Sequence, residues 1–210
     1  MKCAITILFF AVAPFLAAEN GAITEAERSY LIDQLEQSKK GVLASIAGVS
    51  DGQWTFKPAP NVWSVQECTE HIILAENYFF NAAQQALKTP GVARPETSNA
   101  AQDQKLIAAG KDRTSKRKAP EPIVPSGKFA TPQDAARAFT ELRDKSIAYV
   151  KSSDDELRTH VGKGPAGDLD AYQFLLLMAA HSVRHTEQIH EVQADPDYPK
   201  AIAKAQSEQE

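Results

Sequence analysis

Four segments of the chain place apolar residues at spacings of three and four, and each begins with a helix-capping signal. Such a cap lets polar side chains satisfy backbone N–H groups that the first turn of a helix leaves unpaired. The pattern predicts an all-α fold, a four-helix bundle, and we find no convincing strand pattern and no internal repeat. The capping signals are Thr24 with Glu27, Ser64 with Glu67, Thr131 before Pro132, and Asp170 with Gln173.

A long connection, residues 89–130, separates the second predicted helix from the third. It is rich in Pro and Lys, shows no core pattern, and has room for a short helix around residues 103–109. Connections of this length in a compact domain either cross over along the bundle or form a functional flap. We expect one of these two roles.

The N-terminus has the pattern of a signal peptide, residues 1–18. Lys2 is followed by an apolar run and by the small pair Ala17-Ala18, as at a cleavage site. The run is shorter than the about 20 residues that span a bilayer, although an uncleaved N-terminal anchor is the alternative. We therefore expect an exported protein, periplasmic or secreted, with no stable membrane span after cleavage. Its bundle domain would occupy residues 19–200, before a polar C-terminal tail, residues 201–210.

The charge balance limits the possible partners of the chain, and its two cysteines limit the possible disulfides. The 210 residues include 27 acidic and 23 basic side chains, for a net charge of −4, which argues against nucleic acid as a partner. We interpret the basic cluster at residues 111–118 as a solvated loop. Cys3 would leave with the signal peptide, so Cys68 would remain alone and no intramolecular disulfide could form.

Two histidines, His181 and His185, lie four residues apart within the apolar stripe of the fourth predicted helix. Side chains at this spacing share one face of a helix, so both imidazoles can reach one cation. Taken alone, the pair could equally be incidental. A third imidazole is available from His71, which flanks the buried stripe of the second helix, although a single such histidine is usually a hydrogen-bonded core residue. Metal sites in bundle cores are built from facing helices in this way.

Other residues near these histidines have simpler interpretations. His190 falls on the outer face of its helix, and His160 lies in the turn before that helix. Glu67 is one turn before His71 and could act as a base, but the capping box already explains it. Cys68 could be a fourth ligand, but a small buried packing residue is the better interpretation.

The segments "NVWSVQECTEHIILAE", "HSVRHTEQIHEV" and "DPDYP" resemble the DinB superfamily of DinB-like metalloenzymes, over residues from about 24 to 200. The most specific parts are the Trp-Ser-x-x-Glu opening of the second helix, with a His seven residues after the Ser, and the His-x-x-x-His of the fourth. The resemblance implies an up-down-down-up bundle, homodimerisation through bundle faces, and metal ligands at His71, His181 and His185.

Three protein ligands leave a divalent ion with an open position, which is the catalytic pattern. Zn, Ni, Fe and Mn all tolerate three imidazoles plus water. We therefore expect a metal-dependent hydrolase acting on an unknown small molecule. A non-catalytic bundle that binds a metal or a small ligand is the alternative, and a purely structural bundle is a third reading. Several relatives are thiol-dependent transferases, which would fit if the protein is not exported, because the periplasm is oxidising.

Overall fold

Each of the four predicted caps begins a long helix in the computed structural model, which describes residues 21–115, 118–165 and 167–200. The capping boxes of Thr24, Ser64 and Asp170 are present, and Thr131 caps the remaining helix. The predicted signal peptide and the predicted C-terminal tail lie outside the described residues. The four helices are α1 (Glu25–Ile46), α3 (Val65–Ala86), α5 (Pro132–Ser152) and α6 (Ala171–Gln193).

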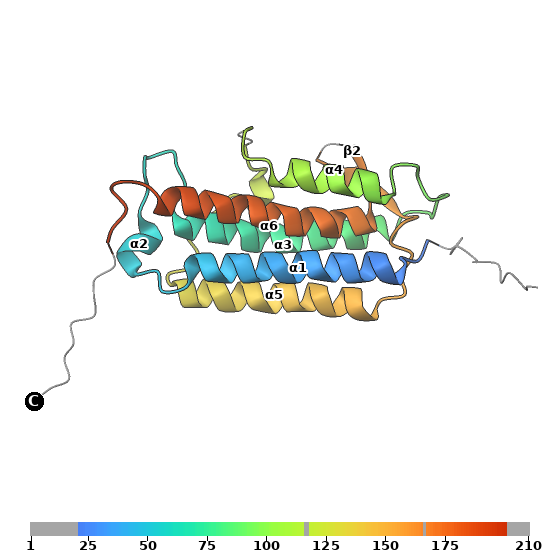
Figure 1. Ribbon diagram of the computed structural model, residues 1–210, viewed down its shortest axis with the longest axis horizontal. Helices are drawn as coiled ribbons and strands as arrows, with labels where there is room; N and C mark the ends of the chain where they lie inside the picture. Colours follow the sequence, from blue (N-terminus) through green and yellow to red (C-terminus); the bar gives the residue numbers. More distant parts are fainter. Residues whose placement is uncertain (1–20, 116–117, 166, 201–210) are drawn as a thin grey trace, which may run out of the picture.

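The four helices form the predicted four-helix bundle with up-down-down-up topology. Figure 1 shows α1 and α6 running in one direction, and α3 and α5 running in the other. Each helix packs against two others: α6 contacts α3 and α1, and α5 contacts α1 and α3. Because α3 and α5 are parallel, the chain must travel back along the whole bundle between them. This requirement explains the length of the connection.

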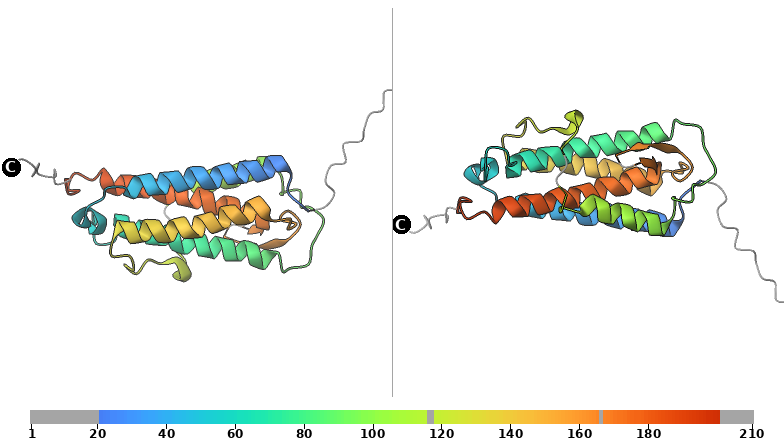
Figure 2. Two further views of the ribbon diagram at one scale, coloured as in Figure 1. Left: turned by 90° about the horizontal axis from the view of Figure 1, so that it is seen from below. Right: turned by 90° about the horizontal axis from the view of Figure 1, so that it is seen from above.

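The connection is more ordered than its sequence indicates. It contains helix α4 (Ala100–Lys111), which is longer than the predicted short helix, and a 3-10 turn, η1 (Glu121–Ile123). Figures 1 and 2 show α4 lying along the outer side of α6. Gly110 permits this close approach, since a Cβ there would lie 2.8 Å from the Cβ of Ala180. Ile107 and Ile123 are buried, so the connection contributes to the core although its sequence shows no core pattern.

Two small elements were missed in the sequence. The segment that follows α1 contains a five-residue helix, α2 (Asp51–Thr55), capped by Ser50. The expectation of no strands was also wrong: β1 (Val161–Gly164) and β2 (Gly167–Asp170) form an antiparallel hairpin before α6. These strands have four residues each and little apolar alternation, so the strand pattern is absent from their sequence.

The core consists of two apolar clusters with a polar layer between them. One cluster surrounds Leu35 and Phe79, and the other surrounds Trp54 and Ile72. Within the layer, the buried guanidinium of Arg143 donates to the carboxylate of Glu76 and to the hydroxyls of Ser38 and Ser182. A buried charge is tolerated only when its partners satisfy it, as they do here. None of the helices in the described part of the chain is long and apolar enough to cross a membrane.

Candidate metal centre

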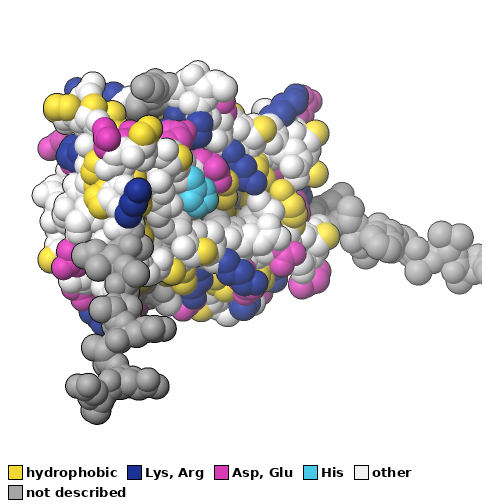
Figure 3. Space-filling view, turned by 60° about the vertical axis from the view of Figure 1, so that its left-hand side comes forward, with side chains coloured by type: hydrophobic (Ala, Val, Ile, Leu, Met, Phe, Trp, Pro, Cys, Tyr) yellow, Lys and Arg dark blue, Asp and Glu magenta, His cyan; other side chains and the backbone are white. Residues whose placement is uncertain are grey.

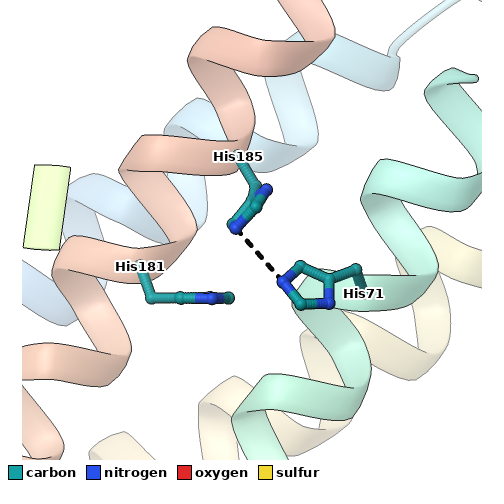
Figure 4. Close-up of side chains that lie close together, drawn as sticks. All are labelled: His71, His181 and His185. Atoms are coloured by element: carbon teal, nitrogen blue, oxygen red, sulfur yellow. Dashed lines mark hydrogen bonds between the residues drawn. The ribbon is translucent and has the colours of Figure 1, made fainter. Parts of the chain in front are cut away.

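The structure brings the three predicted histidines together where α3 and α6 face each other. His71 comes from the second turn of α3, and His181 and His185 lie one turn apart on α6. One potential ligand atom from each lies within 4.8 Å of the others, and Figure 4 shows the three imidazoles converging. His71 and His185 are buried, whereas His181 is partly exposed. This is the only such group of histidine, cysteine and carboxylate side chains among the described residues.

The hydrogen bond of His71 identifies the nitrogen that remains available. Its Nδ1 lies 2.6 Å from the backbone carbonyl oxygen of Ile123, in η1. A carbonyl oxygen can only accept, so Nδ1 carries the proton and donates it. The neutral ring is then unprotonated at Nε2, which points toward α6. A backbone carbonyl in this position is the usual outer partner of a metal-binding histidine.

The hydrogen bonds of His185 likewise identify its protonated nitrogen, through Gln188 and Arg113. Its Nδ1 lies 2.9 Å from Oε1 of Gln188, and Nη1 of Arg113 donates to that same oxygen at 3.1 Å. An arginine has no acceptor, so the amide atom that faces it must be the oxygen. Nδ1 of His185 is therefore the donor, and its Nε2 is unprotonated.

Two unprotonated nitrogens therefore face each other. Nε2 of His71 and Nε2 of His185 are 3.1 Å apart, a hydrogen-bond distance at which neither atom has a proton to donate. Two nitrogens each about 2.0–2.1 Å from one ion, at angles between 90° and the tetrahedral value, would lie about 2.8–3.4 Å apart. In addition, Nδ1 of His181 is buried without a hydrogen-bond partner among the described residues. The donor set fits a cation.

The surroundings favour neutral imidazoles. Burial lowers the pKa of all three histidines, and the positive charge of Arg184 acts in the same direction. The pKa of His185 falls to about 3, and that of His181 lies well below its ordinary value, partly because His185 and His71 are close to it. Neutral imidazole is the form that binds metals, so the rings are ready for a cation at neutral pH.

The carboxylates near the histidines are all engaged elsewhere. Glu67 accepts from the backbone of Ser64, as its capping role predicted, and also pairs with Lys57. Glu70, next to His71, turns away and binds the loop at residues 126–128. Glu191 pairs with Arg113. In the described part of the chain, these three carboxylates are therefore all held by other partners and none is left over to act as a base.

The other candidates considered in the sequence lie apart from the group. Cys68 is fully buried in the cluster around Trp54, where burial raises the pKa of its thiol and keeps it protonated. Nδ1 of His160 donates to the carbonyl of Thr89, and His190 is exposed beside Glu187. These three side chains do not belong to the histidine group.

Aromatic rings surround the imidazoles on the protein side. The ring centroid of Trp63 is 4.8 Å from that of His71, and the ring of Phe79 is 5.3 Å from that of His181. Figure 3 shows acidic, basic and hydrophobic side chains interspersed around a histidine on one face of the molecule. The rings of Trp63 and Phe79 thus make the protein side of the histidine group aromatic.

The partners of the imidazoles were not found from the sequence. Ile123 and Arg113 lie in the connection, and the basic cluster of Arg113 was interpreted as a solvated loop. Gln188 lies on α6 close to the histidines, but its residue type indicated no role. Its spacing of three from His185 was the available signal, because such pairs are neighbours on a helix.

Comparisons with known proteins agree with this architecture. YuaE of Bacillus subtilis (strain 168) is 24% identical over 148 residues, which cover 70% of this chain and 87% of YuaE. A solved structure is similar with a TM-score of 0.56 at 17% identity, covering 82% of this chain and 89% of the other. That protein is YfiT from Bacillus subtilis, described as a probable metal-dependent hydrolase with an unusual four-helix bundle topology. The sequence profile of the DinB superfamily matches residues 34–189. This chain belongs to the DinB superfamily.

Proposed function

We propose that His71, His181 and His185 hold one divalent metal ion, and that the protein uses it as a metal-dependent hydrolase of a small molecule. The observation that carries the metal site is the pair of unprotonated Nε2 atoms of His71 and His185, 3.1 Å apart. Without a cation, their lone pairs repel each other. With one, the contact becomes favourable, and the hydrogen bonds that Nδ1 of each ring donates to its outer partner already have the arrangement that metal-binding histidines use.

The donor set also supports catalysis over a purely structural role for the ion. Three neutral ligands leave at least one position open, and Zn, Ni, Fe or Mn would fit. Such an ion supplies Lewis acidity and makes water nucleophilic near neutral pH. The description of YfiT as a probable metal-dependent hydrolase supports the reaction class.

The chain's own side chains would exclude bulk water and orient the ligands. Trp63 and Phe79 flank the imidazoles, so charges within the site are screened less than in water. Among the described residues, the carboxylates of Glu67, Glu191 and Glu70 are engaged by Lys57, by Arg113 and by the loop at residues 126–128, so none of the three is free to take a proton. Proton removal would therefore depend on the cation and on solvent at the partly exposed His181.

Metal content tests the first part of the proposal. We expect about one equivalent of a divalent metal, by elemental analysis, in protein purified without a metal-affinity tag. His71→Ala, His181→Ala or His185→Ala should each abolish tight binding and remove the metal-dependent rise in melting temperature, because bound metal stabilises only the folded chain. His160→Ala and His190→Ala are the controls and should do neither. Full metal content in all three single variants would refute the site.

Turnover tests the second part. The metal-loaded protein should hydrolyse members of a panel of chromogenic esters and amides, and the His181→Ala variant should lose that activity. A protein that binds metal but hydrolyses none of the panel would favour the alternative, a non-catalytic metal-binding or small-ligand-binding bundle.

The cellular compartment of the protein separates the hydrolase proposal from the thiol-transferase alternative, because a thiol-dependent transferase needs reduced thiols. We propose export, on the signal-like pattern at residues 1–18, and mass spectrometry of the native protein should then find an N-terminus near Glu19. An intact Met1 on a cytosolic protein would instead favour a thiol-dependent transferase, since reduced thiols are available there.

A further inference from the structure

We propose that Gln188 is a positioning residue of the metal site, and that Arg113, from the connection after α4, fixes its orientation. This inference rests on the proposed metal site. It assigns one function to the connection: the connection holds His185 in the tautomer that leaves Nε2 free for a cation.

The first step of the argument is the shared oxygen. Oε1 of Gln188 accepts two hydrogen bonds, from Nδ1 of His185 at 2.9 Å and from Nη1 of Arg113 at 3.1 Å. An amide has an oxygen end and an NH₂ end of nearly the same shape. If it rotated by half a turn, its NH₂ would face the guanidinium, donor against donor. Arg113 therefore selects the oxygen.

The second step is how Arg113 is itself held. Its Nε donates to Oε1 of Glu191 at 3.1 Å, and its Nη2 donates to Oε2 of the same carboxylate. Such a bidentate pair fixes the plane of the guanidinium. Glu191 lies three residues after Gln188 on α6, so Arg113 bridges two side chains that are one helical turn apart. The third nitrogen, Nη1, then reaches Gln188.

The third step is the consequence for the imidazole. A neutral histidine carries its proton on either Nδ1 or Nε2, and only the first form of His185 presents a lone pair to the cation. With no acceptor at Nδ1, the proton could reside on Nε2 and point at Nε2 of His71. Gln188 stabilises the productive form, and His71 receives the equivalent help from Ile123. Loss of such an outer partner typically weakens metal binding about 10- to 100-fold.

Metal affinity is the first test. Dissociation constants for Zn²⁺ are measured by competition with a chromogenic chelator. We expect Gln188→Met, which keeps the length of the side chain but removes the acceptor, to weaken binding about 10- to 100-fold. Gln188→Glu keeps an acceptor for both His185 and Arg113 and should bind within a few-fold of the native protein. Glu187→Met, one residue earlier and exposed, is the matched control and should bind as the native protein does.

The tautomer itself is the second test, in the metal-free protein. Imidazole ¹⁵N NMR distinguishes protonated from unprotonated ring nitrogens. We expect His185 of the native protein to be protonated at Nδ1, and a measurable Nε2-protonated fraction in both Gln188→Met and Arg113→Met. A purely structural role for Gln188 would leave these signals unchanged.

The outcomes separate the two proposals. A native protein that binds no divalent metal refutes the proposed function, whatever its tautomers are. If the native protein binds the metal, and Gln188→Met has the same dissociation constant and the same ¹⁵N signals as the native protein, only the proposed role of Gln188 is refuted. If Gln188→Met does not fold, Arg113→Met decides the matter, because Arg113 lies outside the helices of the bundle and its side chain is partly exposed. Unchanged ¹⁵N signals in Arg113→Met would then overturn the proposal.

Discussion

The carboxylate of Glu70 anchors the far end of the connection. It accepts from the backbone N–H groups of Ser126, Gly127 and Lys128 and from the hydroxyl of Ser126. Burial by itself would raise the pKa of Glu70, but these hydrogen bonds outweigh it and hold the pKa below its ordinary value. The neighbouring residue, His71, also binds the connection, through the carbonyl oxygen of Ile123, and it belongs to the histidine group. One turn of α3 therefore holds the connection at two points and supplies one of the three imidazoles.

Glu70→Gln should destabilise the fold by about 1–3 kcal/mol, because an amide offers one acceptor oxygen where the carboxylate offers two. The lowered pKa also sets a pH dependence. The stabilisation by Glu70 is complete above the unfolded-state pKa and is lost as the pH falls through the folded-state pKa. Urea denaturation should show that the free energy of unfolding changes less between pH 7 and pH 3 for Glu70→Gln than for the native protein. Glu141→Gln, on the exposed face of α5, should behave as the native protein does.

At the scale of elements, capping boxes and apolar spacing predicted the four long helices and their first residues. These signals are local, and tertiary packing agrees with them. The same stripes placed His71, His181 and His185 on facing helices, and their convergence follows from the bundle. Gln188 and Arg113 were harder to predict, because their contact joins segments 75 residues apart and depends on how α4 lies on α6.

Elements with weak local signals were the ones that the sequence did not predict correctly. The hairpin β1–β2 is short and contains Gly167, whose φ of 132° is accessible to glycine and strained for other residues. The burial of Arg143 was not predicted, since nothing in the local sequence shows that Glu76 and two serines would satisfy its charge. Buried polar contacts of this kind are properties of the tertiary structure and not of helical periodicity.

At the scale of the whole molecule, burying three neutral histidines makes the metal-free fold sensitive to acid. Burial lowers their pKa values in the folded state, to about 3 for His185, whereas in the unfolded chain they are about 6.5. The unfolded state therefore binds more protons as the pH falls below about 6.5, and the stability decreases. Above that pH this contribution is complete.

We expect the free energy of unfolding of the metal-free protein to fall between pH 7 and pH 5, by at most about 4 kcal/mol per pH unit, the limit for three protons at about 1.4 kcal/mol each. Urea denaturation in the presence of a chelator measures this free energy of unfolding at each pH. A metal-free His181→Leu variant should show a shallower decrease, because one buried imidazole is gone. Equal stability of the native metal-free protein at pH 7 and pH 5 would contradict this account.

The separation of the histidines along the chain has a consequence for the order of events in the life of the protein. His71 and His185 are 114 residues apart, and the second of them lies on the last helix of the bundle. The proposed ion between them would be a cross-link that closes this long loop, and it could form only after α6 has docked on α3. Metal uptake should therefore be a late step that follows synthesis and collapse of the chain, and a chain truncated before α6 would have no means of retaining the ion.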